Sequence, residues 1–388
     1  MGLSVAIIAV AYNRVDSLSR LLGSLQCAYY TDEVSLIISI DKSDTDVVEK
    51  YADSFEWKFG NKIVDKHKEN LGLRPHMMSL GKWFDQYDAL IILEDDLVVS
   101  KDFYNFSTQA VQKYQDEEKI AGIGLYSYQL SKTYWLPFEP LKDEHDVYFM
   151  QYAISWGQIW MKKSWLKFYD WYQLHQDLTS YLNYLPSDML KWDSRSWLKY
   201  HMCYCLDQDK YFVHPYTSLS TTGCDAGEHF SKSFTGYQVP LQQGHVERYR
   251  LPNIEESNIW YDMFFEYMFP KATLDLNVED ICIDLHGQKK NVEGKHYWLT
   301  PQLLNYKVIK QYGVSYRPLE YNVLLNNEGS DIFLYDTTQS VSKPRSSGYS
   351  AVLFEWRLAG AKDIINIVGV KSLFSGFITL FKELIKLK

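Results

Sequence analysis

Residues 90–99 contain the feature that most limits how this chain can fold. An apolar run ends in three consecutive carboxylates, Glu94, Asp95 and Asp96, and apolar residues follow at once. A short apolar run bounded in this way is typical of a strand buried inside a sheet. Carboxylates at the end of a buried strand repel one another and resist desolvation, so the pattern predicts a cation beside them.

Two interpretations of these acids are open from the residues alone. Mn²⁺ or Mg²⁺ prefers oxygen ligands and commonly takes one or two carboxylates, leaving other positions for water and substrate phosphates. The metal would then bridge the protein to a phosphorylated ligand. The alternative is a solvated strand end whose acids cap the next helix, with Asp102 capping a helix that begins at Phe103.

The first 93 residues alternate between strand-like and helix-like patterns. Strands are expected at 4–11, 33–40, 62–64 and 89–93, with helices between them, which predicts an α/β fold with a mostly parallel, helix-covered sheet. Ligands of such sheets bind beyond the carboxyl ends of the strands. Arg14, Asp41 and the acids 94–96 all follow strand ends, so we expect them to converge.

Several functional classes are disfavoured by what the sequence lacks. The chain of 388 residues has no Gly-x-x-x-x-Gly-Lys-Ser/Thr loop, which argues against a P-loop nucleoside triphosphatase. It also has no Gly-x-Gly-x-x-Gly after its first strand, which argues against a dinucleotide-binding domain. A net charge of −9 argues against general nucleic-acid binding. Five cysteines with no Cys-x-x-Cys pair fit a reduced compartment, and no signal-like or membrane-spanning segment is evident, so a cytoplasmic protein is expected.

Residues 152–229 hold further candidates. Gly157 lies among large aromatic residues, which indicates either close aromatic packing or the approach of a ligand. Asp193 lies near the start of an expected helix and is either its N-cap or a general base. His229 is either a phosphate or metal contact or an ordinary surface-loop histidine.

The order of these segments resembles nucleotide-sugar-dependent glycosyltransferases of the GT-A fold, of the bacterial family-2-like and N-acetylglucosaminyltransferase I types. The resemblance covers about residues 4–230. It is carried by the following residues: Val10-Ala-Tyr-Asn-Arg14, Ser39-Ile-Asp41, Glu69-Asn-Leu-Gly72, Leu93-Glu-Asp-Asp-Leu97 with Asp102-Phe103, Ser155-Trp-Gly157 with Trp165, Trp192-Asp193 and Pro215 to His229.

The resemblance implies how a donor would be bound. Asp96 would ligate Mn²⁺ (or Mg²⁺), which would hold the diphosphate, while Asp95 would bind the ribose and Glu94 would support the metal site. Arg14 and Asp41 would contact the base, most often uracil in these proteins.

The resemblance also implies a catalytic base, Asp193, and a phosphate contact, His76, whose spacing is off by one residue. Gln158 departs from the aromatic residue that many relatives carry after the Ser155-Trp-Gly157 motif, and Cys224-Asp225 is a second departure. Both would change sugar or acceptor preference and leave the transfer reaction itself unaffected.

The expected architecture is a GT-A-type catalytic domain over 1–244, divided at about 125 into a nucleotide-sugar-binding half (1–125) and an acceptor half (126–244). An α+β accessory subdomain covers 245–360, with strand-like pieces near 308, 321–325 and 331–335, and an amphipathic helix follows at 361–388. In residues 371–388 apolar side chains recur at helical spacing between lysines, which is typical of either a helix on the inner membrane surface or one packed against protein.

The function expected is a metal-dependent, inverting glycosyltransferase of the hexosyl- or N-acetylhexosaminyl-transferase class, acting on a glycan or lipid-linked glycan acceptor. The alternatives are a catalytically silent sugar- or nucleotide-binding protein of the same fold and a nucleotidyltransferase. The sequence leaves the oligomeric state and the identity of the sugar open.

Overall fold

The computed structural model describes residues 3–193, 195–225, 236–290, 292, 294–345, 348–372, 374 and 378. The chain divides into two compact units. The larger consists of Met1–Thr133, Phe138–Val278 and Gln288–Glu293, and the smaller of Tyr134–Pro137, Glu279–Gly287 and Gly294–Lys388. The larger unit therefore continues past residue 244, where the sequence placed the end of the catalytic domain.

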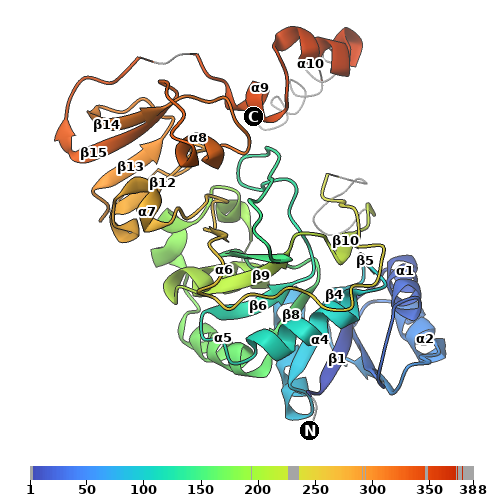
Figure 1. The fold of residues 1–388 in the computed structure, drawn as a ribbon. Coiled ribbons are helices and arrows are strands. Elements are labelled where there is room, and N and C mark those ends of the chain that lie inside the picture. Colours follow the sequence, from blue (N-terminus) through green and yellow to red (C-terminus); the bar gives the residue numbers. More distant parts are fainter. Residues whose placement is uncertain are drawn as a thin grey trace. The chain divides into compact units, whose positions relative to one another are not determined.

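A nine-stranded sheet forms the centre of the larger unit, in the order β11-β7-β9-β6-β8-β4-β1-β2-β3 (Figure 1). Its strands are β1 (Val5–Ala11), β2 (Ser35–Ile40), β3 (Lys62–Lys66), β4 (Ala89–Glu94), β6 (Ile120–Gly124), β7 (Val147–Met150), β8 (Gln158–Met161), β9 (Tyr211–Pro215) and β11 (Trp260–Tyr261). The first four strands pair in parallel, as the sequence predicts, while β8 is antiparallel to β4 and β6, and β7 to β9. The expected mixed α/β fold with a large, mostly parallel central sheet is confirmed.

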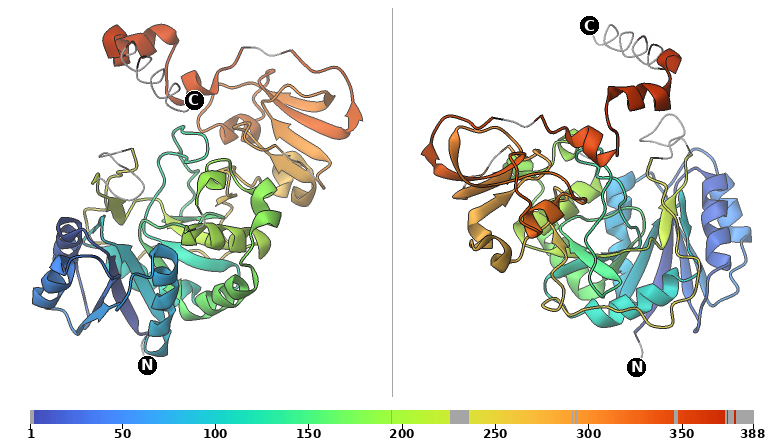
Figure 2. Two further views of the ribbon diagram at one scale, coloured as in Figure 1. Left: turned by 180° about the vertical axis from the view of Figure 1, so that it is seen from behind. Right: turned by 45° about the horizontal axis from the view of Figure 1, so that its top comes forward.

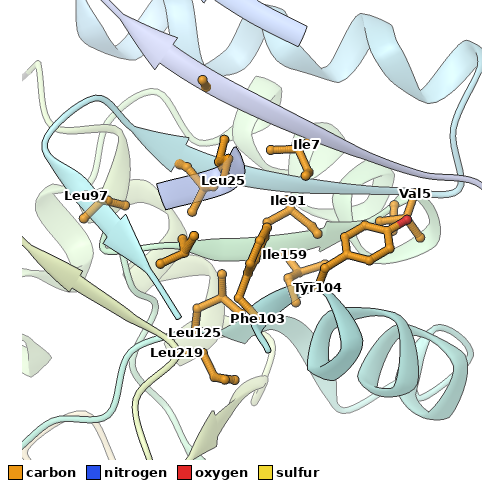
Figure 3. Close-up of a cluster of buried hydrophobic side chains, with 14 of the residues drawn as sticks. Val5, Ile7, Leu25, Ile91, Leu97, Phe103, Tyr104, Leu125, Ile159 and Leu219 are labelled. Carbon is orange, nitrogen blue, oxygen red and sulfur yellow. The ribbon is translucent and has the colours of Figure 1, made fainter. Parts of the chain in front are cut away.

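One face of the sheet packs against helices α1 (Val15–Gln26), α2 (Val47–Ser54) and α4 (Phe103–Tyr114). Alternate residues of each strand point to this face, so Ile7, Ile91 and Ile159 meet Leu25 and Phe103 in one buried cluster (Figure 3). The helices α1 and α2 lie side by side in all three views (Figures 1 and 2). Strand-length apolar runs and helical spacing of leucines therefore account for this half of the core.

The other face of the sheet carries more polar and aromatic side chains. The 3-10 segment Leu80–Asp85 contacts β4 and α5 (Lys162–Leu174) contacts β6 and β8, while α3 (Leu73–Ser79) and α6 (Trp197–Asp207) contact these two elements. Strand residues that point here include Ser39, Glu94, Gln158 and His214, none of which belongs to the apolar cluster. A ligand that needs polar contacts would find them on this side.

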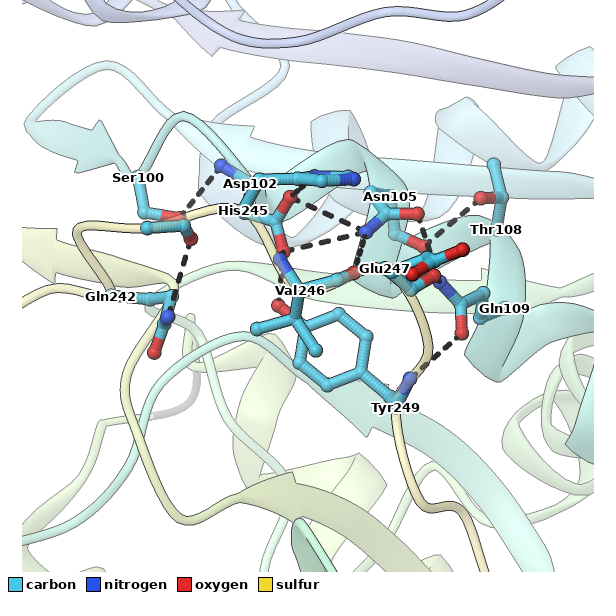
Figure 4. Close-up of polar contacts among 11 residues, drawn as sticks. Ser100, Asp102, Asn105, Thr108, Gln109, Gln242, His245, Val246, Glu247 and Tyr249 are labelled. Atoms are coloured by element: carbon cyan, nitrogen blue, oxygen red, sulfur yellow. Dashed lines mark hydrogen bonds and ion pairs between the residues drawn. The ribbon is translucent and has the colours of Figure 1, made fainter.

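Asp102 occupies the N-cap position of α4, but its carboxylate makes no capping hydrogen bond. It is fully buried and accepts hydrogen bonds from Val246 N and the Tyr249 hydroxyl, with His245 Nδ1 2.6 Å away (Figure 4). Asp102 is thus the N-cap residue of the helix that begins at Phe103, as the second interpretation suggested, but its side chain does not cap that helix and is not solvated. The carboxylate instead anchors the segment 245–249, because a buried carboxylate needs several donors.

The smaller unit contains a four-stranded sheet in the order β12-β13-β15-β14. Its strands are β12 (Ile281–Ile283), β13 (Tyr297–Thr300), β14 (Tyr306–Tyr312) and β15 (Ile332–Ser340). The strand-like pieces near 308 and 331–335 are confirmed, whereas 321–325 is wrong, since Glu320–Leu324 forms helix α8. Asn322 explains this locally, because its buried side chain bonds the backbone of Ser315, Tyr316 and Leu319.

Two short helices, α9 (Ala351–Glu355) and α10 (Ala361–Val368), complete the described part of the smaller unit. The amphipathic pattern of 371–388 lies almost wholly outside the described residues, so the membrane-surface contact stays a prediction. Among the described residues, no helix is both long enough and apolar enough to cross a membrane.

Candidate functional site

Strands β1 and β4 define the point at which the sheet reverses its winding. From β1 the chain passes outward to β2 and β3 and then returns to place β4 on the other side of β1. Such a reversal leaves a crevice beyond the carboxyl ends of the two strands, where open α/β sheets bind ligands. Arg14 follows β1 and the acidic residues close β4, so both flank this crevice.

The guanidinium of Arg14 joins the two strand ends. It pairs with the Asp95 carboxylate, and one of its nitrogens lies 3.2 Å from Asp96 Oδ2. Asp95 is buried, whereas the side chains of Arg14 and Asp96 each keep 28% exposure. The cation that the sequence requires beside these acids is therefore present within the chain itself.

The three acids experience different environments. Burial and, to a smaller extent, the charges of Asp96 and Asp95 raise the pKa of Glu94 to about 8. Burial also raises the pKa of Asp95 to about 6, although Arg14 opposes the shift. The side chain of Asp96 is more exposed than that of Asp95. It lies in the turn between β4 and β5 (Leu97–Val99).

The acidic turn can offer a metal ion one partly exposed carboxylate, that of Asp96, and does not surround the ion with protein ligands. Magnesium and manganese sites often use one or two carboxylates and leave the rest to water and phosphate oxygens, which Asp96 satisfies. In the described part of the chain, the only three His, Cys, Asp or Glu side chains with converging ligand atoms are Asp143, Glu144 and His145. Asp143 already accepts a hydrogen bond from the Ser257 hydroxyl at 2.7 Å, so that cluster is accounted for without an ion.

The loop residues that follow β10 (Ser220–Thr222) contact the acidic turn. Strand β10 pairs with β5, and Gly223 N donates to the Asp96 carbonyl at 2.6 Å. Asp225 in this loop pairs with Arg20 and accepts a hydrogen bond from Ser17, both on α1. The sequence marked Cys224-Asp225 as a departure from the resembling enzymes, but the contact of Asp225 with α1 could not be inferred from spacing. His229 lies outside the described residues.

Asp41 is buried at the end of β2. Its carboxylate accepts hydrogen bonds from the backbone N–H groups of Lys42, Leu71 and Gly72, each at 2.9 Å. Both oxygens thus hold the turn that leads into α3, at the carboxyl end of the strand next to β1. Its contact with a base stays a prediction.

His76 on α3 is buried against the polar face of the sheet. Its Nε2 lies 2.8 Å from Ser39 Oγ, and its ring meets that of His67 edge-on. Burial and, to a smaller extent, the neighbouring His67 lower the pKa of His76 to about 4, so the imidazole is neutral at pH 7. A phosphate contact through His76 would therefore be a neutral hydrogen bond.

Asp193 is an exposed residue before α6. Its carboxylate accepts hydrogen bonds from Arg195 N at 2.8 Å and from Arg195 Nε at 3.0 Å. The helix begins at Trp197 with Ser196 as its N-cap, so the N-cap alternative for Asp193 is wrong. Its role as a base stays a prediction.

An aromatic group lines the polar face beyond β6 and β8. Gln158 pairs with Ile92 of β4, so residues just before β8 lie near Glu94. There Trp156 packs against Tyr126 and Tyr237, and Lys132 Nζ lies 3.7 Å above the Trp156 ring. No sequence pattern pointed to Lys132, which belongs to an irregular aromatic stretch.

Gly157 and Gln158 both occupy constrained positions. Gly157 has a φ of 86°, and a Cβ there would lie 3.0 Å from Ser220 Oγ, so a larger residue would disturb β10. Gln158 is buried, and neither polar atom of its amide has a hydrogen-bond partner among the described residues. An unpaired buried amide is costly, which makes Gln158 a candidate contact for a polar ligand group.

His201 of α6 provides a pH-dependent prediction. It is buried, stacks on Phe168, and burial lowers its pKa to about 3. Below pH 6.5 His201 binds a proton in the unfolded chain, but in the folded protein it stays neutral down to about pH 3. The free energy of unfolding therefore falls as pH falls from 6.5 towards 3. At pH 5 this cost is about 2 kcal/mol, from about 1.4 kcal/mol per pKa unit.

Replacing His201 with phenylalanine removes this proton uptake. We expect the loss in free energy of unfolding between pH 7 and pH 5 to be about 2 kcal/mol smaller in His201→Phe, measured by urea denaturation at both pH values. Equal losses in the two proteins would contradict the assignment of His201 as a buried neutral group.

Comparison with known proteins gives no family. No protein-family model matches this chain, and no curated protein matches it. Among solved structures, TarS of S. aureus in complex with UDP-GlcNAc is 14% identical over 60% of this chain and 62% of that chain, with a TM-score of 0.38. GalNAc-T7 with UDP, GalNAc and Mn²⁺ is 15% identical over 55% of this chain and 42% of that chain, with a TM-score of 0.37.

A third solved structure is a mannosyltransferase from Pyrobaculum calidifontis in complex with GDP-Man and Mn²⁺. It is 9% identical over 42% of this chain and 46% of that chain, with a TM-score of 0.31. The matched region spans less than two thirds of each of these three chains. Because every TM-score is below 0.5, the function of this protein has to be argued from its own residues.

Proposed function

We propose that this protein is a glycosyltransferase that moves a sugar from a nucleotide diphosphate sugar to a hydroxyl group of a glycan or lipid-linked glycan. The observation that carries the proposal is the meeting of Arg14 with Asp95 and Asp96 at the reversal between β1 and β4. Open α/β sheets bind nucleotides at this position. UDP-sugars are the first donors to test, with a hexosyl or N-acetylhexosaminyl group transferred.

The crevice offers separate places for the parts of a donor. Arg14 and Asp41 lie on the wall next to β2, where a base would stack, and the buried Asp95 carboxylate would accept hydrogen bonds from a ribose. Asp96 would hold Mn²⁺ or Mg²⁺, which when bound would neutralise charge on the diphosphate leaving group. Glu94 supports the metal side, and His76 is the candidate phosphate contact from α3.

Transfer with inversion requires one base to remove the proton of the acceptor hydroxyl. The resemblance to GT-A enzymes gives this role to Asp193, which lies on the segment before α6. A catalytically silent binding protein would bind the donor without turnover. A nucleotidyltransferase would bind a nucleoside triphosphate more tightly than a diphosphate, so experiment can distinguish both alternatives from a glycosyltransferase.

Calorimetric titration tests the proposal directly. UDP, GDP, CDP and UTP would each be titrated into the intact chain with Mn²⁺ and again with a chelator. We expect one diphosphate to bind in a manganese-dependent way, and the matching nucleotide sugars to be hydrolysed slowly without an acceptor. Tighter binding of UTP would favour a nucleotidyltransferase, and binding without any turnover would favour the silent binder.

A further inference from the structure

A carboxylate other than Asp193 lies against the aromatic group beyond β8. Asp188 directly precedes the 3-10 segment Met189–Lys191, and its Oδ1 is buried without a hydrogen-bond partner among the described residues. A buried carboxylate oxygen with no donor is costly, so such an atom points to a group that binds there. Asp193, by contrast, is exposed and held by Arg195.

The charged groups around Asp188 make it the better-placed base. Lys132 is the strongest charged neighbour, Lys191 is a weaker one, and the phenol groups of Tyr152 and Tyr237 also face it. Burial raises the pKa of Asp188, while the backbone N–H groups of Asp188 and Met189 and the charge of Lys132 oppose that shift and favour the ionised carboxylate. An ionised carboxylate that water does not solvate is a competent proton acceptor.

Lys132 links Asp188 to the acidic turn. Its ammonium lies over the Trp156 ring and makes no hydrogen bond or ion pair to any residue that the structure describes. It interacts electrostatically with Asp188 and, more weakly, with Glu94. Asp188 and Glu94 are therefore both within electrostatic reach of the same cation, Lys132.

Tyr128 and Tyr152 extend the same polar region. Both rings are buried, their centroids are 5.4 Å apart, and neither hydroxyl has a hydrogen-bond partner among the described residues. Three unpaired polar atoms, from Tyr128, Tyr152 and Asp188, thus gather around one aromatic wall. A sugar presents an apolar face for the rings and hydroxyl groups for these atoms, which is the chemistry this wall would recognise.

We propose that Asp188, and not Asp193, is the base that accepts the acceptor's proton, with Lys132 as a positioning residue beside it. This rests on the proposed glycosyltransferase function. In the reaction, the bond from the anomeric carbon to the diphosphate oxygen breaks and its electron pair leaves on the diphosphate. The acceptor oxygen bonds to the anomeric carbon, and its proton passes to Asp188 Oδ1.

The test compares Asp188→Asn with Asp193→Asn, a matched change in the same segment. UDP-N-acetylglucosamine, UDP-glucose, UDP-galactose and GDP-mannose serve as probes, and release of UDP or GDP to water is followed with Mn²⁺ and without an acceptor. We expect Asp188→Asn to lower kcat by about 10²-fold to 10⁴-fold, the range for loss of a general base. Asp170→Asn, at an exposed aspartate of α5, should stay within about 3-fold of the unchanged protein, and Asp193→Asn should lose less activity than Asp188→Asn.

Nucleotide titration and thermal unfolding accompany each variant. Unchanged affinity for UDP or GDP in Asp188→Asn shows that the loss is catalytic, since a misfolded protein would lose binding as well. Lys132→Met should move the acidic limb of the kcat/KM profile to higher pH, a shift that a purely structural lysine would not cause.

Two results would overturn the inference. Full turnover in Asp188→Asn would remove it as the base, and a large loss in Asp193→Asn alone would return the role to Asp193. If the unchanged protein binds no nucleoside diphosphate and hydrolyses none of the four probes, the proposed function itself fails and the inference falls with it.

Discussion

Replacing Asp96 with asparagine is expected to weaken manganese-dependent binding of the nucleoside diphosphate by about 100-fold or more. Metal-held contacts to a diphosphate are worth several kcal/mol, and every 1.4 kcal/mol changes affinity tenfold. The change preserves shape, and Arg14 keeps its contact with Asp95, so the fold should be retained. The measurement is calorimetric titration with Mn²⁺ and with chelator.

Asp170→Asn provides the matched control for Asp96. Asp170 is an exposed aspartate on α5, away from the strand ends, so its replacement removes one charge without touching the crevice. With chelator present, the unchanged protein and both variants should bind equally weakly. If Asp96→Asn keeps the manganese-dependent affinity, then Asp96 does not ligate the metal.

Much of the sheet could be predicted from the sequence, because its strands are continuous apolar runs. Buried parallel strands lack alternation, so β1, β2 and β4 are recognisable from composition and length alone. The convergence of Arg14 with the acidic turn follows from the rule that ligands collect at the carboxyl ends of parallel strands. The antiparallel strands β7 and β8 gave no such signal, since they are four residues long and lie in an aromatic stretch.

The sequence could not reveal which polar groups pair with one another. Three acids in a row indicated a cation, but whether Arg14 or a metal supplies the charge depends on a contact between residues 81 positions apart. Asp41 shows the same limit, because its carboxylate binds backbone groups of a turn 30 residues further along the chain. The motif Trp192-Asp193 drew attention to one carboxylate, whereas burial, which no motif encodes, singles out Asp188.

Arg14→Gln is expected to lower the free energy of unfolding by about 3 kcal/mol, because it leaves the buried Asp95 without its cation. Nucleotide binding should be lost as well, since the crevice wall would carry uncompensated negative charge towards a diphosphate. Urea denaturation measures the first effect and calorimetry the second. The decrease in the free energy of unfolding measures how strongly Arg14 stabilises the acidic turn in the absence of a metal.

Two further variants separate this charge effect from loss of packing. Arg20→Gln also removes an arginine from α1, but its partner Asp225 is 37% exposed, so the expected loss is about 1 kcal/mol or less. Adding Asp95→Asn to Arg14→Gln removes the uncompensated charge and should restore most of the stability without restoring nucleotide binding. If the double variant is no more stable than Arg14→Gln, the arginine acts through packing. The predicted cation beside the acidic residues would then have to be the metal.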